Sequence, residues 1–376
     1  MSKANLPFQI QKRKIMSKDK LLSEFKLGKI SLKNRVVMAP MTRSRAIENN
    51  VANPLMAEYY GQRTEAGLII TEGTSPSPNG LGYPRIPGIF NEDQVKGWKL
   101  VTDKVHEDGS KIFIQLMHTG RVSHKDNLPS GAKVLSPSAI KVSGKMYVDG
   151  KGPLEHSEPT AMTKEEIKEA VQEYANAAVL AMDAGFDGVE IHAANGYLIE
   201  QFLNPKANER TDEYGGSKEN RSRFLVEVAS AVVDAIGAHK TGLRISPYGV
   251  FNDTGEFDGV DEQYRYIAQQ MSEMSLVYIH MVDHSKMGTP EVPQRIKDIV
   301  RENFKGAYVL SGGYDKERAE ADLQKGLGEL VAFGVPFIAN PDLVTRMKVG
   351  MELAEADQKT FYTFGSEGYT DYPKTK

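Results

Sequence analysis

Three polar residues near the middle of the chain have types and spacing that suit carbonyl chemistry. His192, Asn195 and Tyr197 directly follow the apolar segment 188–191, which is typical of a buried strand. Histidine and asparagine donate hydrogen bonds, and tyrosine carries an ionisable hydroxyl. Two donors and a proton source can polarise a carbonyl group and protonate the carbon beside it. An isolated motif of this kind is more often a core histidine and a loop asparagine, so a catalytic role depends on the surrounding elements.

Length and composition limit the classes of protein to which this chain can belong. The chain has 376 residues, a net charge of −3 and no cysteine. The length allows two ordinary domains or one large α/β barrel. The lack of cysteine excludes disulfides, thiolate catalysis and cysteine-ligated metals. The charge balance offers no basic field for nucleic acid, and no apolar run reaches the roughly 20 residues that span a membrane. We expect a cytoplasmic protein that binds neither nucleic acid nor membrane.

Eight short apolar segments alternate with helical patterns. The segments are 34–43, 67–73, 111–118, 188–193, 242–246, 277–282, 307–311 and 330–334. The clearest helix begins at Thr163, which has a capping-box spacing to Glu166, and ends at Gly185. This alternation predicts an α/β fold, a single (β/α)8 TIM barrel.

The remaining segments complete the predicted organisation. Residues 29–32 are expected to form part of a short hairpin that closes the barrel floor. Residues 119–162 are too long for one helix and are rich in Gly, Pro, Ser and Lys, which predicts an excursion over the barrel mouth after the third strand. The basic residues 1–20 resemble an organelle transit peptide only faintly. We expect them to form a flexible leader, with 21–376 as the folded unit.

Polar residues gather at the C-terminal ends of the predicted strands, where this fold places its active sites. The residues at these strand ends are Thr42, Gly73, Gln115, His192, Asn195, Arg244, Gly312, Gly313 and Gly334. The set contains no acid pair, no lysine for a Schiff base and no metal-ligating cluster. The glycine-lined turns after strands seven and eight are typical of a phosphate site, or else serve only as tight turns. Asn340 and Pro341 then predict the N-cap and first residue of a short extra helix.

A flat heteroaromatic ligand with a phosphate tail fits this set. Thr42 could bond a ring carbonyl, Gln115 an imide edge, and Arg244 a negative charge on a reduced ring.

The chain resembles the Old Yellow Enzyme family of FMN-dependent ene-reductases. The matching segments occur in the same order from about Leu22 to Pro373. They are 34–43, 115–121, 192–198, 201–205, 208–216, 340–343 and 361–373.

The resemblance implies a role for each matching residue. FMN would contact Ala39, Pro40, Met41, Thr42, Gly73, Gln115 and Arg244, with Gly312, Gly313, Phe333, Gly334 and Val335 at its phosphate end. His192 and Asn195 would bind the substrate oxygen beside FMN, and Tyr197 would donate the proton. Thr42 joins these three among the catalytic residues. The substrate pocket would include Tyr83, Met117, Phe251 and Tyr362, the last of which also reaches FMN.

Two positions depart from the family pattern. Met117 stands where tryptophan is common, so a smaller, flexible side chain should reshape the pocket. Val335 stands where an arginine usually holds the flavin phosphate. We therefore expect looser FMN binding, unless another cation such as Arg346 or Lys316 occupies the site.

The predicted reaction is reduction of the activated C=C bond of enones or nitro compounds, by a ping-pong mechanism. The reductant is NADPH or NADH, FMN is the bound cofactor, and the protein is a monomer or homodimer. One alternative is a flavin-binding protein with little turnover. Another is a different FMN barrel oxidoreductase such as a dihydroorotate dehydrogenase, which would need a lysine and nucleophile pattern that the sequence lacks.

Overall fold

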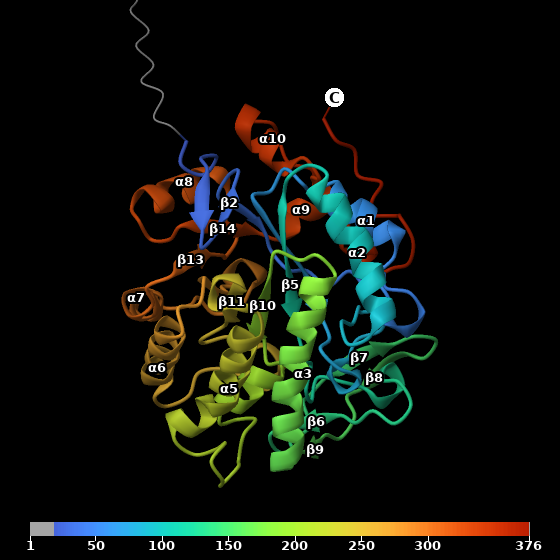
Figure 1. The fold of residues 1–376 in the computed structure, drawn as a ribbon, viewed down its shortest axis with the longest axis vertical. Helices are drawn as coiled ribbons and strands as arrows, with labels where there is room; N and C mark the ends of the chain where they lie inside the picture. The colour runs from blue at the N-terminus through green and yellow to red at the C-terminus, as the bar shows by residue number, and fades with distance from the viewer. Residues whose placement is uncertain (1–18, 376) are drawn as a thin grey trace, which may run out of the picture.

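The structure, a computed structural model, describes residues 19–375. Its centre is a closed barrel of eight parallel strands (Figure 1). In chain order they are β3 (Val36–Met38), β4 (Leu68–Thr74), β5 (Lys111–Leu116), β10 (Gly188–Ala193), β11 (Thr241–Ile245), β12 (Tyr278–Met281), β13 (Ala307–Leu310) and β14 (Leu330–Phe333). Each lies inside or overlaps one predicted segment, so the predicted (β/α)8 barrel is confirmed.

The barrel strands are buried on both faces. Every residue of β4, β10 and β11 is buried. Side chains on one face of each strand fill the barrel, and those on the other face pack under the helices. This double burial explains why the strand sequences are continuously apolar and do not alternate.

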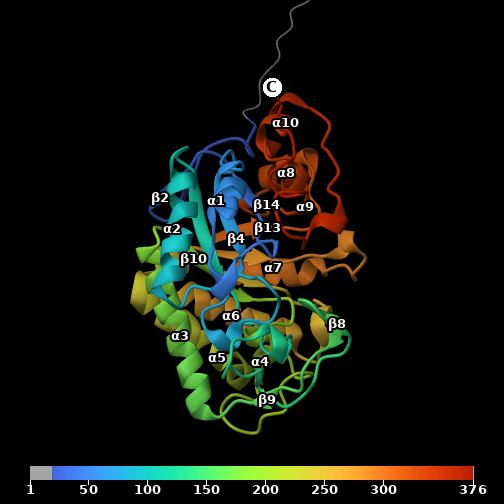
Figure 2. The same cartoon turned by 90° about the vertical axis from the view of Figure 1, so that its right-hand side faces the viewer.

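Helices cover the outside of the barrel (Figure 1, Figure 2). The longer ones are α1 (Pro54–Gly61), α2 (Glu92–His106), α3 (Lys164–Asp183), α5 (Lys218–Ile236), α6 (Val260–Glu273), α7 (Gln294–Asn303) and α8 (Lys316–Gln324). Three short helices, α4 (Leu198–Leu203), α9 (Val335–Ala339) and α10 (Leu343–Val349), follow β10 and β14. The predicted capping box is present at α3, where the side chains of Thr163 and Glu166 each accept from the other's backbone N–H. Short 3-10 turns lie at Glu48–Asn50, Pro78–Gly80, Lys125–Asn127, Ala238–Lys240, Phe251–Asp253, Ser285–Met287 and Gln358–Thr360.

An antiparallel hairpin closes the floor of the barrel, as predicted. It pairs β1 (Phe25–Leu27) with β2 (Ile30–Leu32). Leu27 and Leu32 belong to one buried cluster with residues from six barrel strands, including Leu68 and Phe113. The opposite end of the barrel is therefore the end open to ligands.

The predicted role of Asn340 as a helix N-cap is wrong. Asn340 caps the C-terminus of α9, where its Nδ2 donates to Pro336 O at 2.8 Å. Helix α10 begins three residues later, at Leu343, with Asp342 as its N-cap. The cause is that α9 starts immediately after β14, so Asn340 comes at the end of a helical turn that was not foreseen.

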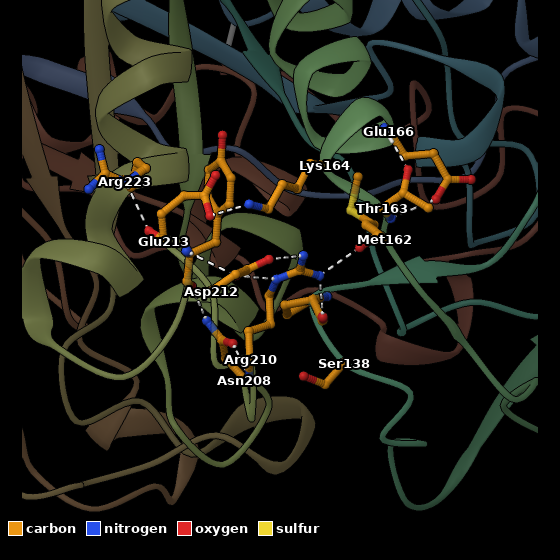
Figure 3. Close-up of polar contacts among 12 residues, drawn as sticks. Ser138, Met162, Thr163, Lys164, Glu166, Asn208, Arg210, Asp212, Glu213 and Arg223 are labelled. Carbon is orange, nitrogen blue, oxygen red and sulfur yellow. Dashed lines mark hydrogen bonds and ion pairs between the residues drawn. The ribbon is translucent and has the colours of Figure 1, made fainter.

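Residues 119–162 carry two small sheets. Strand β6 (Leu135–Ser136) pairs with β9 (Thr160–Ala161), and β7 (Lys145–Val148) pairs with β8 (Gly152–Glu155). Arg210, beyond α4, binds this segment at two points on either side of the β7–β8 hairpin, because its Nη1 donates to Pro137 O at 3.0 Å and to Met162 O at 2.6 Å (Figure 3). The side chain of Arg210 is oriented by its ion pair with Asp212 at 2.6 Å.

The C-terminal segment is bound to the barrel by buried arginines. Arg43 donates to the carbonyl oxygens of Phe361 at 3.1 Å and Gly368 at 2.8 Å, and Arg45 donates to Phe361 O at 2.7 Å. This places Tyr362 at the open end of the barrel, described below.

Most of the predicted leader lies outside the described residues. Of its last two residues, Asp19 pairs with Lys316 at 3.2 Å and Lys20 donates to Glu320 at 2.9 Å, so both contact α8. Within the described range, no helix is long and apolar enough to cross a membrane.

Candidate active site

Two rows of polar side chains cross the barrel near the ends of its strands. His192, Arg244 and His280 are register partners on β10, β11 and β12. One row deeper, Glu190 of β10 is the register partner of Gln115 on β5. Because residues two apart on a strand face the same side, Glu190 and His192 point the same way. The closed barrel therefore stacks these side chains in two polar layers.

Glu190 is the centre of the deeper layer. It accepts hydrogen bonds from Gln115 Nε2 at 2.7 Å, Tyr278 OH at 3.0 Å and His280 Nδ1 at 3.0 Å. Burial acts to raise the pKa of Glu190, but His280, Arg244 and these hydrogen bonds together bring it below its usual value. The result is a buried carboxylate that orients Gln115. Sequence reasoning missed Glu190, although an acid inside an apolar strand was the available signal.

His192 is a neutral hydrogen-bond donor. Burial, and then the nearby Arg244, hold its pKa well below the usual value. Its Nδ1 accepts from the backbone N–H of Ala194 at 3.2 Å. A neutral imidazole carries one hydrogen, so that hydrogen resides on Nε2. The Nε2–H group is therefore available to an oxygen atom of a ligand.

Asn195, like His192, is oriented as a hydrogen-bond donor. Its φ of +59° lies in the left-handed region, which asparagine tolerates. Its Oδ1 lies 3.1 Å from Nε2 of His284, and since an amide oxygen only accepts, His284 donates. Burial lowers the pKa of His284 to about 4, so this ring is neutral at pH 7. The Nδ2 hydrogens of Asn195 remain for a ligand. Sequence reasoning missed His284, which is 89 residues away.

Tyr197 is a protonated phenol beside His192. The two rings meet edge to face with 5.0 Å between centroids. The Tyr197 hydroxyl donates to the Tyr83 hydroxyl at 3.2 Å. Burial raises the pKa of Tyr197 above its usual value, so the hydroxyl keeps its proton at neutral pH. The structure thus brings His192, Asn195 and Tyr197 together at the end of β10.

Glu200 supports the loop that carries these residues. Its Oε2 accepts from the backbone N–H of Gly196 at 2.6 Å, and Ser246 Oγ donates to Oε1 at 3.0 Å. Ser246 in turn accepts from the backbone N–H of Asn195 at 2.7 Å. Burial raises the pKa of Glu200 to about 7. Neither Glu200 nor Ser246 was identified from the sequence.

A cavity of about 760 Å³ opens over Tyr197. Its walls include Thr42, Tyr83 and Tyr362 of the predicted site, residues 143–147 and His156 of the segment after β5, and Lys359. The segment after β5 therefore forms part of the wall of this cavity.

Two predicted pocket residues lie near this cavity. Met117 is buried in a cluster against which Tyr83 and Tyr197 pack. It also fills the space beside Gly73, where an added Cβ would lie 2.4 Å from Met117 Sδ. Phe251 lies edge to face with His284, with 4.8 Å between ring centroids.

The exits of the first and eighth strands are also adjacent. The backbone N–H of Ala39 donates to Phe333 O at 3.0 Å. A Cβ added at Gly334 would lie 3.7 Å from Met41 Sδ and 3.9 Å from Ala39 Cβ. The segment 39–42, which includes Pro40 and Thr42, therefore lies beside the turn that follows β14.

Arg244 is a buried cation that makes no ion pair with the described residues. Its Nε has no hydrogen-bond partner, and its guanidinium makes no side-chain hydrogen bond among the described residues. Burial lowers its pKa from the usual value. A buried charged group of this kind is normally paired. The site therefore presents a cation that suits an anionic or polar ligand.

The family follows from these features and from comparison with known proteins. A family model described as the NADH:flavin oxidoreductase / NADH oxidase family matches residues 20–354. The chain belongs to this family. The predicted resemblance to the Old Yellow Enzyme family is confirmed by relatives and solved structures alike.

Relatives of this flavin oxidoreductase family align along nearly the whole chain. A 12-oxophytodienoate reductase 1 from Oryza sativa subsp. japonica is 42% identical, over 94% of this chain and 92% of the relative. The flavin oxidoreductase hxnT from Emericella nidulans is 40% identical, over 94% and 97%. The structure of morphinone reductase superposes with a TM-score of 0.91 at 41% identity, over 96% and 97%. An old yellow enzyme homologue from Zymomonas mobilis gives a TM-score of 0.89 at 38% identity, over 94% and 99%.

The described residues fit FMN, the cofactor of this flavin oxidoreductase family. The unpartnered guanidinium of Arg244 and the amide of Gln115 offer donors to a flavin ring. Gly312 and Gly313 have φ angles of +125° and +62°, which favour glycine, and a turn of glycines lets backbone N–H groups approach a phosphate closely. Among the described residues, no cluster of His, Cys, Asp or Glu could hold a metal ion.

The position of the family arginine is not filled by the cations suggested from sequence. Val335 is 48% exposed. Arg346 pairs with Asp342 at 2.8 Å, and Lys316 pairs with Asp19 at 3.2 Å. Both cations are therefore engaged by carboxylates elsewhere.

Proposed function

We propose that this protein reduces the activated C=C bond of α,β-unsaturated carbonyl or nitro compounds, with NADPH or NADH as the reductant. The observation that carries this proposal is the pair of N–H donors on His192 and Asn195 beside the protonated hydroxyl of Tyr197. Relatives named 12-oxophytodienoate reductase and morphinone reductase support the same class of reaction.

We propose that FMN lies across the polar layers described above. Its ring would contact the 39–42 segment, Gly73, Gln115, His192, Asn195, Arg244 and Tyr362, and its phosphate would lie at Gly312, Gly313 and the turn formed by Phe333, Gly334 and Val335. When bound, FMN supplies the redox chemistry, accepting hydride from NAD(P)H and returning it to the substrate. The family match over residues 20–354 supports 21–376 as the FMN-binding unit.

His192 and Asn195 would bind the carbonyl or nitro oxygen of the substrate. Both donors are held in place before the substrate arrives, His192 by Ala194 and Asn195 by His284. Preorganised donors stabilise negative charge that develops on an oxygen atom during reaction. The imidazole rings of His192 and His284 are both neutral, so neither ring brings a formal positive charge of its own to the oxygen.

Tyr197 would protonate the α carbon of an enone. Its raised pKa keeps the hydroxyl protonated, and the hydrogen bond to the Tyr83 hydroxyl holds this group in position. Thr42 lines the same cavity and would contact the ring edge of the cofactor. Substrate and reductant would enter this cavity in turn, which is the basis of a ping-pong mechanism. One neighbouring structure, morphinone reductase in complex with tetrahydroNAD, supports a nicotinamide dinucleotide as the reductant.

An anaerobic titration tests the proposed function. The purified protein should be yellow and should release FMN, not FAD, on denaturation. NADPH or NADH should bleach the flavin absorbance, and cyclohexenone should restore it. A protein that stays colourless after incubation with FMN would contradict the proposal.

The same titration distinguishes the proposed enzyme from a second candidate, a flavin-binding protein with little turnover. The exposed Val335 motivates this candidate, because weak phosphate binding would leave the cofactor poorly retained. Bleaching by NADPH with no recovery on addition of any enone or nitroalkene would favour it.

We further propose a cytoplasmic location and a monomeric or homodimeric state, in keeping with the small-molecule chemistry of the site.

A further inference from the structure

The phosphate end of the proposed cofactor site lacks an obvious cation. FMN carries a phosphate, and charge-assisted hydrogen bonds to phosphate are among the stronger polar contacts in proteins. Val335 supplies only its backbone N–H at the start of α9, and the Gly312–Gly313 turn after β13 supplies only backbone groups. A third strand end, that of β12, lies next to this turn.

The loop after β12 packs directly on the glycine turn. A Cβ added at Gly313 would lie 2.2 Å from Cγ and 2.7 Å from Cβ of Lys286. A Cβ added at Gly312 would lie 2.9 Å from Cβ of Asp283. Since real side chains cannot approach so closely, the two glycines leave the space in which this loop lies. The aliphatic stem of Lys286 is therefore laid across the backbone of Gly313.

The other cations near this turn are already engaged. Lys297 pairs with Asp283 at 2.7 Å. Arg318 donates to Gly312 O at 2.9 Å and lies 3.8 Å from Asp322.

Lys286 differs from these cations. Its side chain is exposed, with no ion pair and no side-chain hydrogen bond to any residue in the range 19–375. Asp283, the nearest acid on its loop, is held by Lys297 and by the backbone N–H of Ser285 at 3.0 Å. The ammonium group of Lys286 is thus free, while its stem is positioned by Gly313.

We infer that Lys286 binds the phosphate of FMN and replaces, from the end of β12, the cation that the turn after β14 lacks. A lysine is a mobile point charge on a flexible stem, so it can reach a phosphate from a neighbouring loop without the fixed geometry of an arginine. This inference rests on the proposed function, because it assumes that FMN is the ligand.

The test compares FMN with riboflavin, which has the same ring and no phosphate. Full-length holoprotein is prepared with FMN or, by exchange, with riboflavin, and flavin release is followed by fluorescence on dilution. Lys286→Gln keeps the stem and removes the charge. It should weaken FMN binding about tenfold to a hundredfold, the range expected for a charge-assisted hydrogen bond, and leave riboflavin binding unchanged. Adding Val335→Arg to Lys286→Gln should restore FMN binding.

Lys348→Gln is the matched control. Lys348 is an exposed lysine on α10 with no ion pair in the described part of the chain, and α10 lies at the end of the molecule away from β7 and β8 (Figure 1). This control should bind both flavins like the parent. Equal losses of FMN and riboflavin in Lys286→Gln would assign Lys286 a packing role and overturn the inference. Unchanged FMN release would also overturn it, whereas a parent that binds neither flavin would contradict the proposed function itself.

Discussion

His192 and Asn195 become hydrogen-bond donors through neighbours outside their own motif. The Ala194 N–H selects the tautomer of His192, and His284 fixes the amide orientation of Asn195. Glu200 and Ser246 hold the backbone of the rest of the motif through hydrogen bonds. Chemistry at this site therefore depends on both the donors and the residues that orient them.

Replacing Tyr197 by phenylalanine tests the proton donor. Tyr197→Phe should slow the half-reaction with cyclohexenone roughly a hundredfold or more, since general acid catalysis contributes on this scale. Reduction of the flavin by NADPH should be spared, because that half-reaction needs no proton on carbon. Stopped-flow absorbance separates the two. Tyr83→Phe, which removes only the partner hydroxyl at 3.2 Å, is the control and should have a smaller effect. Parental enone rates in Tyr197→Phe would show that another group is the acid.

Glu200 predicts a pH dependence of stability. Burial raises its pKa from 4.5 to about 7, so the folded protein keeps a proton that the unfolded chain releases. The stability from this group is complete below pH 4.5 and is lost as pH rises towards 7. Glu200→Gln mimics the protonated form and should remove this loss, worth roughly 3 kcal/mol in total.

Chemical denaturation at pH 5 and pH 8 measures the effect of Glu200→Gln. The variant should gain stability relative to the parent between these values. Glu72, whose pKa burial also raises to about 7, is present in both proteins and cancels in the difference. A pH-independent difference would mean that Glu200 is ionised throughout.

At the scale of elements, the loop after α4 holds the segment that walls the cavity. Arg210 bonds the carbonyls of Pro137 and Met162, which flank β6 and β9 (Figure 3). The backbone N–H of Glu209 adds a bond to Ser138 Oγ at 2.9 Å. One arginine therefore binds the chain on both sides of residues 143–147 and His156, which restricts the motion of this part of the cavity wall.

Arg210→Lys should loosen this segment without unfolding the barrel. Lysine lacks the planar fork that contacts Asp212 and the two carbonyls together. We expect faster proteolytic cleavage within 119–162 and a higher KM for enones, at a cost of about 1–3 kcal/mol in stability. Arg223→Lys is the control, because Arg223 lies in the same cluster and bonds only Glu213 O and Asn220. Equal cleavage rates in Arg210→Lys and the parent would show that the segment is held by other contacts.

At the scale of the whole molecule, the charge of the cavity mouth differs from that of the protein. The net charge is −3, yet the cavity wall contains Arg85, Lys145 and Lys359 and, within the described residues, no acid. Arg85 already pairs with Asp149. The two lysines make no ion pair among the described residues, so they are free to attract an anionic ligand.

This charge distribution predicts a preference for NADPH over NADH, since NADPH carries an additional phosphate. The KM for NADPH should be severalfold lower at low ionic strength, and the advantage should shrink as salt screens the exposed lysines. Replacing Lys145 and Lys359 together by glutamine should abolish the preference while leaving kcat unchanged. Steady-state kinetics at two salt concentrations provide the measurement. Equal KM values for both reductants in the parent would contradict this prediction.

Much of the fold and part of the site could be predicted from the sequence alone. The eight apolar segments, the capping box at Thr163 and Glu166, and the His192, Asn195 and Tyr197 spacing are local patterns. Local patterns determine strands, caps and loops because they depend on side-chain period and on nearby backbone groups. They also placed the three motif residues at a strand end, which is where the structure has them.

Only the tertiary structure decided which distant residues support the site. Glu190 meets Gln115 and His280 because barrel closure sets the register between strands, and no local pattern encodes that register. For the same reason, the partnership of His284 with Asn195 could not be predicted. The sequence shows that position 335 is a valine, but which cation lies beside the glycine turn depends on how the loops after β12 and β13 pack together.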